Sequence, residues 1–483
     1  MERRTFLQTA AGAALATPLP AAGQRMAGIQ VGAVSFVDEG VEQVLDIFQQ
    51  NSVNTLFIAT FTYGRGIAGR QVPGQPLPDH GKQQYDDGTG PGAFHGGAYT
   101  RVNPEYFRDT VLRQFRAPEF GDYDVLDAVL PSARKRGMKT ICWFEDVWGG
   151  PDKVPNVAEV QERQFDGAHA STLCFNNPNY RNWLLGMVEN YGRSYEIDGI
   201  MWGSERQGAF ANAIRGSRNP RAVTCFCQYC EAKARARGID VQRARAGFEA
   251  LTAFVTSARQ GHKPIDGYYV ETWRLMLRYP ELLAWEMLWT DSLRETYAAM
   301  HARAKSVKPG LGIGWHIWHN NSFSPIYRAE QDLSELSKYS DFLKMVMYHN
   351  CAGERMAGYI RGVDSTMFHD VPAEQLLEFH YRVLGYEREK SLAEIPHTGF
   401  SAEYVREEAA RARAALNGTK TLLWPGIDID IPTARDSSKS TPEGTRAAVR
   451  AAIEAGADGV LLSRKYSEMR LANLRAAGEA LRG

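Results

Sequence analysis

The sequence lacks an excess of charge of either sign, because 56 lysine and arginine residues are balanced by 56 aspartate and glutamate residues. The balance excludes the strongly basic surface on which proteins bind nucleic acid or anionic lipid. No apolar run reaches the length of a membrane-spanning helix. A glycine-rich phosphate-binding loop followed by lysine is missing as well. We therefore expect no nucleic-acid partner, no membrane span and no organic cofactor.

The first 25 residues are typical of an export signal. Arg3 and Arg4 precede Phe6 and Leu7, and a mild stretch of alanine, leucine and glycine follows. This pattern resembles a twin-arginine (Tat) signal, and its apolar part is too short and too weak to anchor in a bilayer. The resemblance implies a periplasmic or secreted protein. The alternative is a cytosolic protein with an amphipathic start.

Eight short apolar runs, each followed by a loop and a helical pattern, recur along the chain. They cover residues 29–36, 53–60, 138–145, 197–203, 311–318, 341–348, 419–426 and 457–463. The runs are continuous rather than alternating, which suits parallel strands that are covered on both faces. Eight strand–helix units predict an α/β fold, a (β/α)8 TIM barrel, in which residues 26–483 form one catalytic domain.

Two long insertions are expected, one after the second strand and one after the fourth. The first spans residues 64–121 and is rich in glycine, proline, aspartate and histidine, and the second spans about 206–290. Loops of this length inside a compact domain are uncommon unless they are functional. The first insertion would cover the C-terminal face of the barrel, where active sites of this fold lie.

Polar and aromatic side chains gather just after the predicted strands, and in a barrel they would converge on one cavity. Aromatic faces pack on sugar rings, and polar groups bind sugar hydroxyls, so we expect a saccharide or glycoside as substrate. The candidate sugar-binding residues are His95, Trp143, Asp146, Trp148, Arg206, His316, His319, Lys344, Tyr348, Trp424 and Arg464.

Cleavage of a glycosidic bond needs two carboxyl groups that flank it. We expect Glu205, in "GIMWGSERQGAF", to be the proton donor. The second carboxylate is Asp428, Asp430 or Glu145, each of which follows or ends a predicted strand. In the alternative interpretation, Glu205 pairs structurally with a neighbouring arginine, and the two aspartates cap a turn or bind a cation.

Four cysteines form a pattern that is suited to a metal. Cys225, Cys227 and Cys230 stand in a Cys-x-Cys-x-x-Cys motif, and Cys174 lies earlier in "STLCFNNPNYRNW". Four thiolates make a closed tetrahedral structural zinc site. Disulfides, which an oxidising compartment favours, and reduced thiols are the alternatives.

The region from about residue 138 to 232 resembles family 42 glycoside hydrolases, which are retaining β-galactosidases on a (β/α)8 barrel. That family carries a Cys-x-Asn-x-Pro-x-Tyr-like stretch, matched here by Cys174, Asn176, Pro178 and Tyr180. A Cys-x-Cys-x-x-Cys run follows its acid/base glutamate and helps to hold zinc. The resemblance therefore implies that Glu205 is the acid/base residue and that the four cysteines bind zinc.

This chain departs from the family pattern at two points. Ser204 stands where the family has asparagine, and only aspartates follow the seventh strand, where the family has its glutamate nucleophile. The chain also resembles uncharacterised exported bacterial glycosidase-like barrels.

We expect an exported glycoside hydrolase. One alternative is a barrel that binds saccharide without cleaving it. Another is a metal-dependent lyase or isomerase that uses Glu145, Asp146, His316 and His319. The oligomeric state stays open, and a homo-oligomer is one alternative.

Overall fold

A computed structural model of the chain describes residues 25–86, 94–147, 153–215, 222–386 and 389–482. The predicted export signal up to residue 24 and the predicted sugar-binding residue Trp148 lie outside the described residues. Within these ranges, none of the helices is long and apolar enough to span a membrane.

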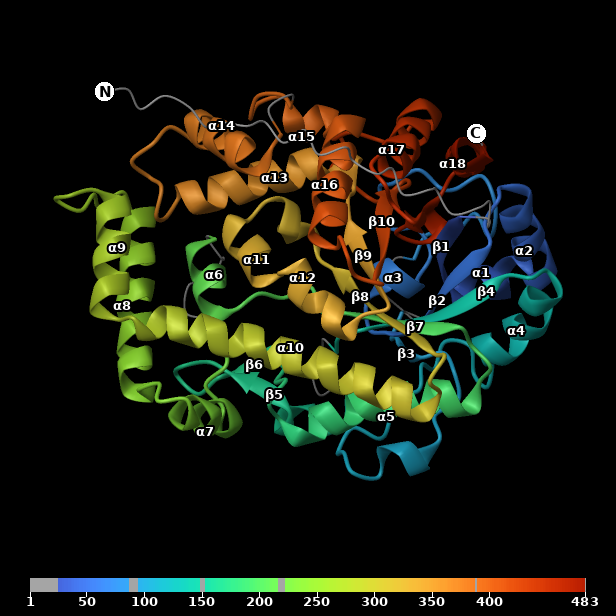
Figure 1. The fold of residues 1–483 in the computed structure, drawn as a ribbon, viewed down its shortest axis with the longest axis horizontal. Coiled ribbons are helices and arrows are strands. Elements are labelled where there is room, and N and C mark those ends of the chain that lie inside the picture. Colours follow the sequence, from blue (N-terminus) through green and yellow to red (C-terminus); the bar gives the residue numbers. More distant parts are fainter. Residues whose placement is uncertain (1–24, 87–93, 148–152, 216–221, 387–388, 483) are drawn as a thin grey trace, which may run out of the picture.

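Eight parallel strands form a closed barrel at the centre of the molecule (Figure 1). Its closure follows from β1, which pairs with β2 on one side and with β11 on the other. The strands in order around the barrel are β1 (Met26–Gly32), β2 (Thr55–Thr62), β4 (Lys139–Glu145), β7 (Gly199–Gly203), β8 (Gly312–Ile317), β9 (Phe342–Val346), β10 (Leu422–Asp428) and β11 (Gly459–Ser463). The predicted (β/α)8 barrel is confirmed.

One predicted strand ends earlier than expected. Residues 33–36, predicted as strand, form the first turn of the helix α1 (Ala33–Glu39). All four of these residues are buried, and a short buried helical turn has the same continuous apolar pattern as a buried strand.

Helices surround the barrel (Figure 1). The long ones that follow the strands are α2 (Val41–Gln50), α4 (Val125–Lys135), α5 (Pro178–Ser194), α10 (Glu281–Val307), α13 (His349–Asp364), α14 (Ala373–Leu384), α16 (Ala402–Ala415), α17 (Pro442–Glu454) and α18 (Leu471–Arg482). Shorter helices between β8 and β10 are α11 (Pro325–Glu330), α12 (Leu333–Leu336) and α15 (Ile395–Thr398).

The connections after β2, β4 and β7 carry further elements. They are α3 (Arg65–Ala68), the strand β3 (Gly97–Ala98), β5 (Gln161–Arg163), β6 (His169–Leu173), α6 (Ala209–Ile214), α7 (Gln228–Ala236), α8 (Val241–Arg259) and α9 (Tyr268–Arg278). The helices α7, α8 and α9 lie to one side of the barrel (Figure 1). An apolar cluster separate from the barrel core holds them together, with Phe226 stacked on Trp285 at 4.4 Å.

Large apolar side chains fill the inside of the barrel. This inner cluster contains Phe57, Ala59, Ile141, Trp143, Met201, Phe342, Trp424 and Leu461. Trp143 and Trp424 are 2% and 7% exposed, and the Trp424 ring stacks on Phe342 at 4.1 Å. These two predicted sugar-binding tryptophans are therefore packing residues of the barrel interior.

The alternation of side chains along each strand determines which residues lie above this core. Side chains of a strand point to opposite faces in turn, so the residue two positions after an inward one also points inward. On β4 that residue is Glu145, two positions after Trp143, and on β9 it is Lys344, two positions after Phe342. His316 on β8 is the register partner of Lys344. The carboxyl ends of the strands thus place an acid, a histidine and a lysine over the apolar core.

Candidate functional site

Glu205 lies just beyond the carboxyl end of β7, and its side chain contacts His316 of the neighbouring β8. The Oε1 atom of Glu205 is 2.9 Å from Nε2 of His316. The side chain of Glu205 is 51% exposed, whereas that of His316 is 9% exposed. The predicted acid is therefore accessible to a ligand and is held by a buried histidine.

Lys344 completes a row of three polar groups. Its Nζ is fully buried, lies 3.2 Å from Nδ1 of His316 and donates to the hydroxyl of Tyr348 at 2.6 Å. Burial lowers the pKa of Lys344 to about 7. In its charged form the ammonium group only donates, so Nδ1 of His316 then accepts and the imidazole proton is on Nε2, facing Glu205. Burial and the charge of Lys344 lower the pKa of His316, which favours this neutral form.

Glu205 is ionised at neutral pH. The surrounding protein partly desolvates the carboxylate and so raises its pKa, but the hydrogen bond and charge interaction with His316 and the nearby charges of Arg355 and Lys344 outweigh this effect, and the pKa falls to about 2. The sequence predicted Glu205 as the proton donor. A carboxyl group with this pKa has no proton to donate at neutral pH, so the electrostatics of the site oppose that role.

The pKa of Glu145, in contrast to that of Glu205, is raised. It ends β4 as the register partner of Gly203, and its Oε2 accepts a hydrogen bond from Thr62 Oγ1 at 2.8 Å. Burial, together with the negative charge of Glu205, raises its pKa to about 7, although the bond from Thr62 and the charge of Arg464 act against this. Glu145 therefore carries a proton below neutral pH. Thr62, which sequence reasoning missed, ends β2 and could have been found as a polar strand-end residue.

Arg355 on α13 is a second residue that sequence reasoning missed. Its Nη1 donates to Nδ1 of His319 at 2.9 Å, and Nε2 of His319 lies 3.0 Å from the hydroxyl of Tyr404. His319 is fully buried, which lowers its pKa well below the usual value. The predicted sugar ligand His319 thus holds an arginine and has no surface for a substrate. No strand-end signal marks Arg355, because it lies inside a helix.

Asp146 and Arg206 lie in a buried network behind the site. Nε of Arg206 is 2.8 Å from Asp146, and its Nη1 is 3.2 Å from Glu162. Asp146 also accepts hydrogen bonds from the hydroxyls of Ser204, at 2.6 Å, and Tyr180. Both residues were predicted to bind sugar, but their charges are satisfied by the protein. They shape the Ser204–Gln207 segment instead.

Asp428 and Asp430, predicted as second carboxylates, are also engaged by protein groups. Asp428 is buried, lies 2.8 Å from Nδ1 of His349 and accepts from the backbone N–H of Asn350 at 3.1 Å. It thereby caps the first turn of α13, as the alternative interpretation expected. The Asp430 carboxylate accepts from the backbone and guanidinium of Arg470, at 2.8 and 2.7 Å. These contacts argue against both aspartates as the second catalytic carboxylate and leave Glu145.

Of two other predicted sugar-binding residues, Arg464 lies near the strand-end acids and His95 does not contact them. The guanidinium of Arg464 is hydrogen-bonded to Glu468 at 2.5 Å, yet its charge acts on Glu145. Nδ1 of His95 lies 2.7 Å from the carbonyl oxygen of Gly96, and its ring packs near Tyr63. None of the contacts of His95 among the described residues involves the strand-end acids.

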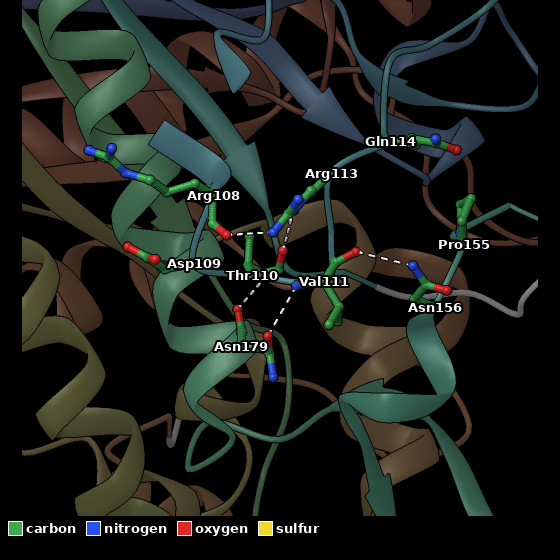
Figure 2. Close-up of a pocket in the computed structure, with 9 residues that line it drawn as sticks. All are labelled: Arg108, Asp109, Thr110, Val111, Arg113, Gln114, Pro155, Asn156 and Asn179. Atoms are coloured by element: carbon green, nitrogen blue, oxygen red, sulfur yellow. Dashed lines mark hydrogen bonds between the residues drawn. The ribbon is translucent and has the colours of Figure 1, made fainter. Parts of the chain in front are cut away.

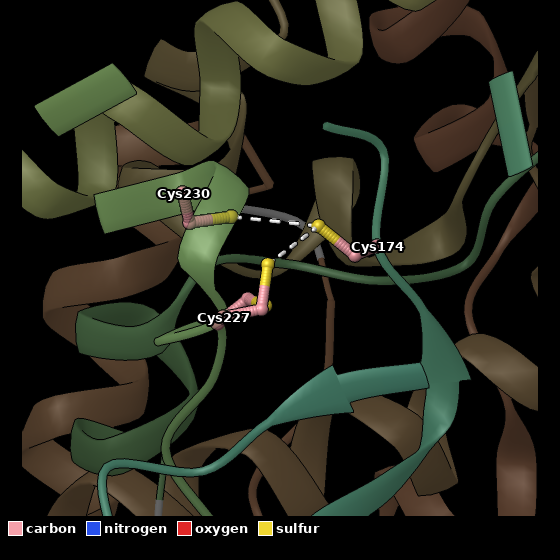
Figure 3. A group of neighbouring side chains, drawn as sticks. Cys174, Cys227 and Cys230 are labelled. Carbon is pink, nitrogen blue, oxygen red and sulfur yellow. Dashed lines mark hydrogen bonds between the residues drawn. The ribbon is translucent and has the colours of Figure 1, made fainter. Parts of the chain in front are cut away.

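The four predicted cysteine ligands come together, three of them visible in Figure 3. Their sulfur atoms lie within 4.8 Å of one another, and Sγ of Cys174 is 3.5 Å from Cys227 and 3.4 Å from Cys230. A tetrahedron with Zn–S bonds of about 2.3 Å has S–S edges of about 3.8 Å. These distances fit a tetrahedral metal site and are far too long for a disulfide bond of about 2.05 Å.

Two groups around the cysteines donate hydrogen bonds to sulfur atoms. The side-chain amide of Asn176 donates to Sγ of Cys230 at 3.3 Å, and the backbone N–H of Arg163 donates to Sγ of Cys225 at 3.5 Å. Hydrogen bonds from the neighbouring thiols lower the pKa of Cys227, whereas burial and contacts with the other thiols raise the pKa of Cys174, Cys225 and Cys230. The donor set therefore fits zinc. Among the described residues, this is the one converging group of three or more cysteine, histidine or acidic side chains. The ligand set expected for a metal-dependent lyase or isomerase does not converge.

A separate cavity of about 530 Å³ lies at the surface (Figure 2). Its lining residues are Arg108, Asp109, Thr110, Val111, Arg113, Gln114, Pro155, Asn156 and Asn179. None of them belongs to the cluster around Glu205, and the wall is held by hydrogen bonds such as that from the backbone N–H of Val111 to the side-chain Oδ1 of Asn179 at 3.1 Å. We assign no role to it.

No protein-family model and no curated protein matches this sequence. Three solved structures are similar to it in fold. A β-galactosidase from the Antarctic haloarchaeon Halorubrum lacusprofundi has a TM-score of 0.51 and 14% identity, over 94% of this chain and 58% of that chain. α-L-Fucosidase isoenzyme 2 from Paenibacillus thiaminolyticus has a TM-score of 0.49 and 12% identity, over 95% of this chain and 49% of that chain.

The third is a catalytic mutant of Gan42B, a GH42 β-galactosidase from G. stearothermophilus, with a TM-score of 0.49 and 12% identity. It is matched over 95% of this chain and 57% of that chain. This chain therefore spans about half the length of the fucosidase and little more than half that of the two galactosidases. At 14% identity, the similarity to the β-galactosidase from H. lacusprofundi shows a shared fold alone.

Proposed function

We propose that this protein hydrolyses glycosidic bonds, with Glu145 as the general acid and Glu205 as the ionised carboxylate. The observation that carries the proposal is the pair of carboxyl groups at the ends of neighbouring strands with opposite protonation. Glu145 has a pKa of about 7 and Glu205 one of about 2. Two acids whose surroundings separate their pKa values in this way suit the two roles of a glycosidase.

Each carboxyl group has a defined task in this reaction. Glu145 protonates the departing glycosidic oxygen. Glu205 faces the developing positive charge of the sugar and acts as the nucleophile or as the base for water. Its charge is maintained by the proton that His316 donates, and His316 is oriented by Lys344. Because all three groups are in place before substrate binds, the transition-state charge is stabilised at little cost of rearrangement.

The barrel fold also supports a catalytic role for Glu145 and Glu205, although without specifying the reaction. Catalytic residues of TIM-barrel enzymes lie at the carboxyl ends of the strands, where Glu145 and Glu205 lie. The β-galactosidase from H. lacusprofundi has the same fold, although that similarity does not specify a sugar.

The experiment compares Glu145→Gln with Glu205→Gln on two leaving groups. A panel of 4-nitrophenyl glycosides first finds the sugar that is cleaved. The same sugar is then tested as the 2,4-dinitrophenyl glycoside, whose leaving group needs no proton. We expect E145Q to lose about 10²–10⁴-fold in kcat/KM on a poor leaving group and to recover most of it on dinitrophenolate. E205Q should lose activity on both.

Two results would contradict the assignment. If E205Q is rescued by the good leaving group and E145Q is not, the two roles are exchanged. If the wild-type protein binds saccharides and cleaves none of the glycosides, the chain is a saccharide-binding barrel.

We also propose that the four cysteines hold a structural zinc ion and that the chain is exported. The distances between the sulfur atoms support the first proposal, and Arg3 and Arg4 support the second. For export, replacing both arginines with lysine should retain the protein in the cytoplasm, as measured by cell fractionation. Unchanged export of this variant would contradict a twin-arginine route.

A further inference from the structure

In the part of the chain that the structure describes, Arg355 presents a positive charge without a direct salt-bridge partner beside the proposed reaction centre. Its side chain is exposed, and among the described residues no carboxylate lies within 4 Å of its guanidinium. This contrasts with the arginines of the buried networks, since Arg206 pairs with Asp146 and Arg328 pairs with Glu408. A guanidinium without a carboxylate partner is free to bind one from a ligand.

The guanidinium of Arg355 is held in place from behind. Nη1 donates to Nδ1 of His319, so the imidazole proton of His319 is on Nε2 and is donated to the hydroxyl of Tyr404. Tyr404 in turn donates to Ser322 at 2.8 Å. The three supporting side chains are buried, so one edge of the guanidinium is fixed before a ligand arrives. Such a fixed guanidinium loses little conformational entropy when it binds.

A second arginine nearby, Arg215, also lacks a carboxylate partner among the described residues. Arg215 follows α6, and its guanidinium lies 5.1 Å from the ring centre of Trp318. Within the described ranges it too has no carboxylate within 4 Å. Burial and the positive charge of Arg355 lower the pKa of Arg215, which shows that the two cations repel each other. Two like charges that lack a carboxylate in direct contact are a costly arrangement that a bound anion would relieve.

Arg355 lies at the site of the proposed reaction, because its guanidinium is 5.8 Å from the ring centre of Tyr348, whose hydroxyl accepts a hydrogen bond from Lys344. Arg215 packs on Trp318, the residue before the His319 that holds Arg355. We propose, on the basis of the proposed function, that the substrate is an anionic glycoside whose carboxylate or ester sulfate binds Arg355 and Arg215. A uronic acid and a sulfated sugar share this chemistry. The planar guanidinium forms paired hydrogen bonds with either group.

The experiment measures binding without turnover, by calorimetry with monosaccharides. D-Glucuronate and D-galacturonate represent the carboxylate, D-galactose 6-sulfate represents the sulfate, and D-glucose and D-galactose are the neutral comparisons. We expect at least one anionic sugar to bind about tenfold or more tightly than its neutral counterpart, and this preference to shrink as salt screens the charges. Arg355→Met should abolish the preference, and Arg215→Met should reduce it.

Arg361→Met is the matched control, since Arg361 is exposed on the same helix and is not part of the site. It should leave binding unchanged, and thermal unfolding will show whether each variant is folded. The proposal is overturned if anionic and neutral sugars bind equally, or if R355M weakens both to the same extent. Hydrolysis of a neutral glycoside with no anionic preference would leave the proposed function intact. An Arg355-dependent preference without hydrolysis of any glycoside would leave this inference standing and reject that function.

Discussion

The imidazole of His316 lies 2.9 Å from the carboxylate of Glu205 and binds it through the nitrogen that carries the proton. This contact is the strongest of the interactions that favour the ionised form of Glu205. It stabilises the charge of Glu205, and that charge in turn makes the ionisation of Glu145 harder. The division of roles between the two acids is therefore a property of the assembled barrel.

The pH dependence of kcat/KM should show that Glu145 acts in its protonated form and Glu205 in its ionised form. Glu205 is ionised above about pH 2, and Glu145 is protonated below about pH 7, so both groups are in the required form between these values. We expect activity to fall as pH rises through about 7, by about tenfold for each unit beyond it. A pH–rate profile checks this. An activity that rises from pH 6 to pH 9 would contradict Glu145 as the acid.

Replacing His316 should move the acidic limb of that profile. His316→Ala removes a hydrogen bond to a charged group, which is worth about 1.5–3 kcal/mol, so the pKa of Glu205 should rise by about one to two units. Activity should then be lost at a higher pH than in the wild type. His316→Gln, whose amide can also donate to Glu205, should restore part of the shift. Equal acidic limbs in all three proteins would show that His316 does not control Glu205.

The lack of a side chain at Gly203 makes room for the side chain of His316. A methyl group at residue 203 would lie 2.6 Å from Cβ of His316, closer than two carbon atoms can approach. We expect Gly203→Ala to cost about 1–3 kcal/mol in the free energy of unfolding and to lower kcat as His316 moves. Denaturant unfolding and initial rates measure the two effects. Gly358→Ala on α13, where nothing lies within 4 Å, should cost neither.

The cysteine cluster predicts one zinc ion per chain. Cys230→Ser should abolish zinc retention, as measured by elemental analysis, and lower the thermal midpoint, because a structural zinc site contributes its binding energy to folding. Cys142→Ala is the control, since Cys142 lies on β4 outside the cluster and should leave the metal content unchanged. Zinc content that is the same in both variants would reject the site.

Asp430 should matter for stability and not for catalysis. Its carboxylate accepts from Arg470 and from the side-chain amide of Asn473 at 2.9 Å, which ties β10 to α18. Hydrogen bonds to a charged group contribute about 1.5–3 kcal/mol, so Asp430→Ala should lower the free energy of unfolding by about 2 kcal/mol. The kcat should stay within about twofold of the wild type, since the partners of the Asp430 carboxylate are Arg470 and Asn473 and neither is a proposed catalytic group. A loss of several orders of magnitude would restore Asp430 as a catalytic carboxylate.

The sequence by itself determined the barrel and several of the groups at its mouth. Continuous apolar runs predict buried parallel strands, and the residues at their carboxyl ends must meet at one face. For this reason Glu145, Glu205, His316 and Lys344 could be named as candidates, and the cysteine spacing identified the cluster of four thiols. These features depend on the local pattern and on the periodicity of strands.

Only the tertiary structure decided which candidates are free to act. Asp146, Asp428 and Asp430 follow strands just as Glu205 does, yet each is bound by groups from distant segments. The protonation of Glu145 and Glu205 depends on burial and on charges from other strands and helices. Arg355 lies on a helix and Arg215 just after one, so neither carries a strand-end signal. Pairing and pKa are properties of three-dimensional neighbours, and a linear pattern contains no distances between them.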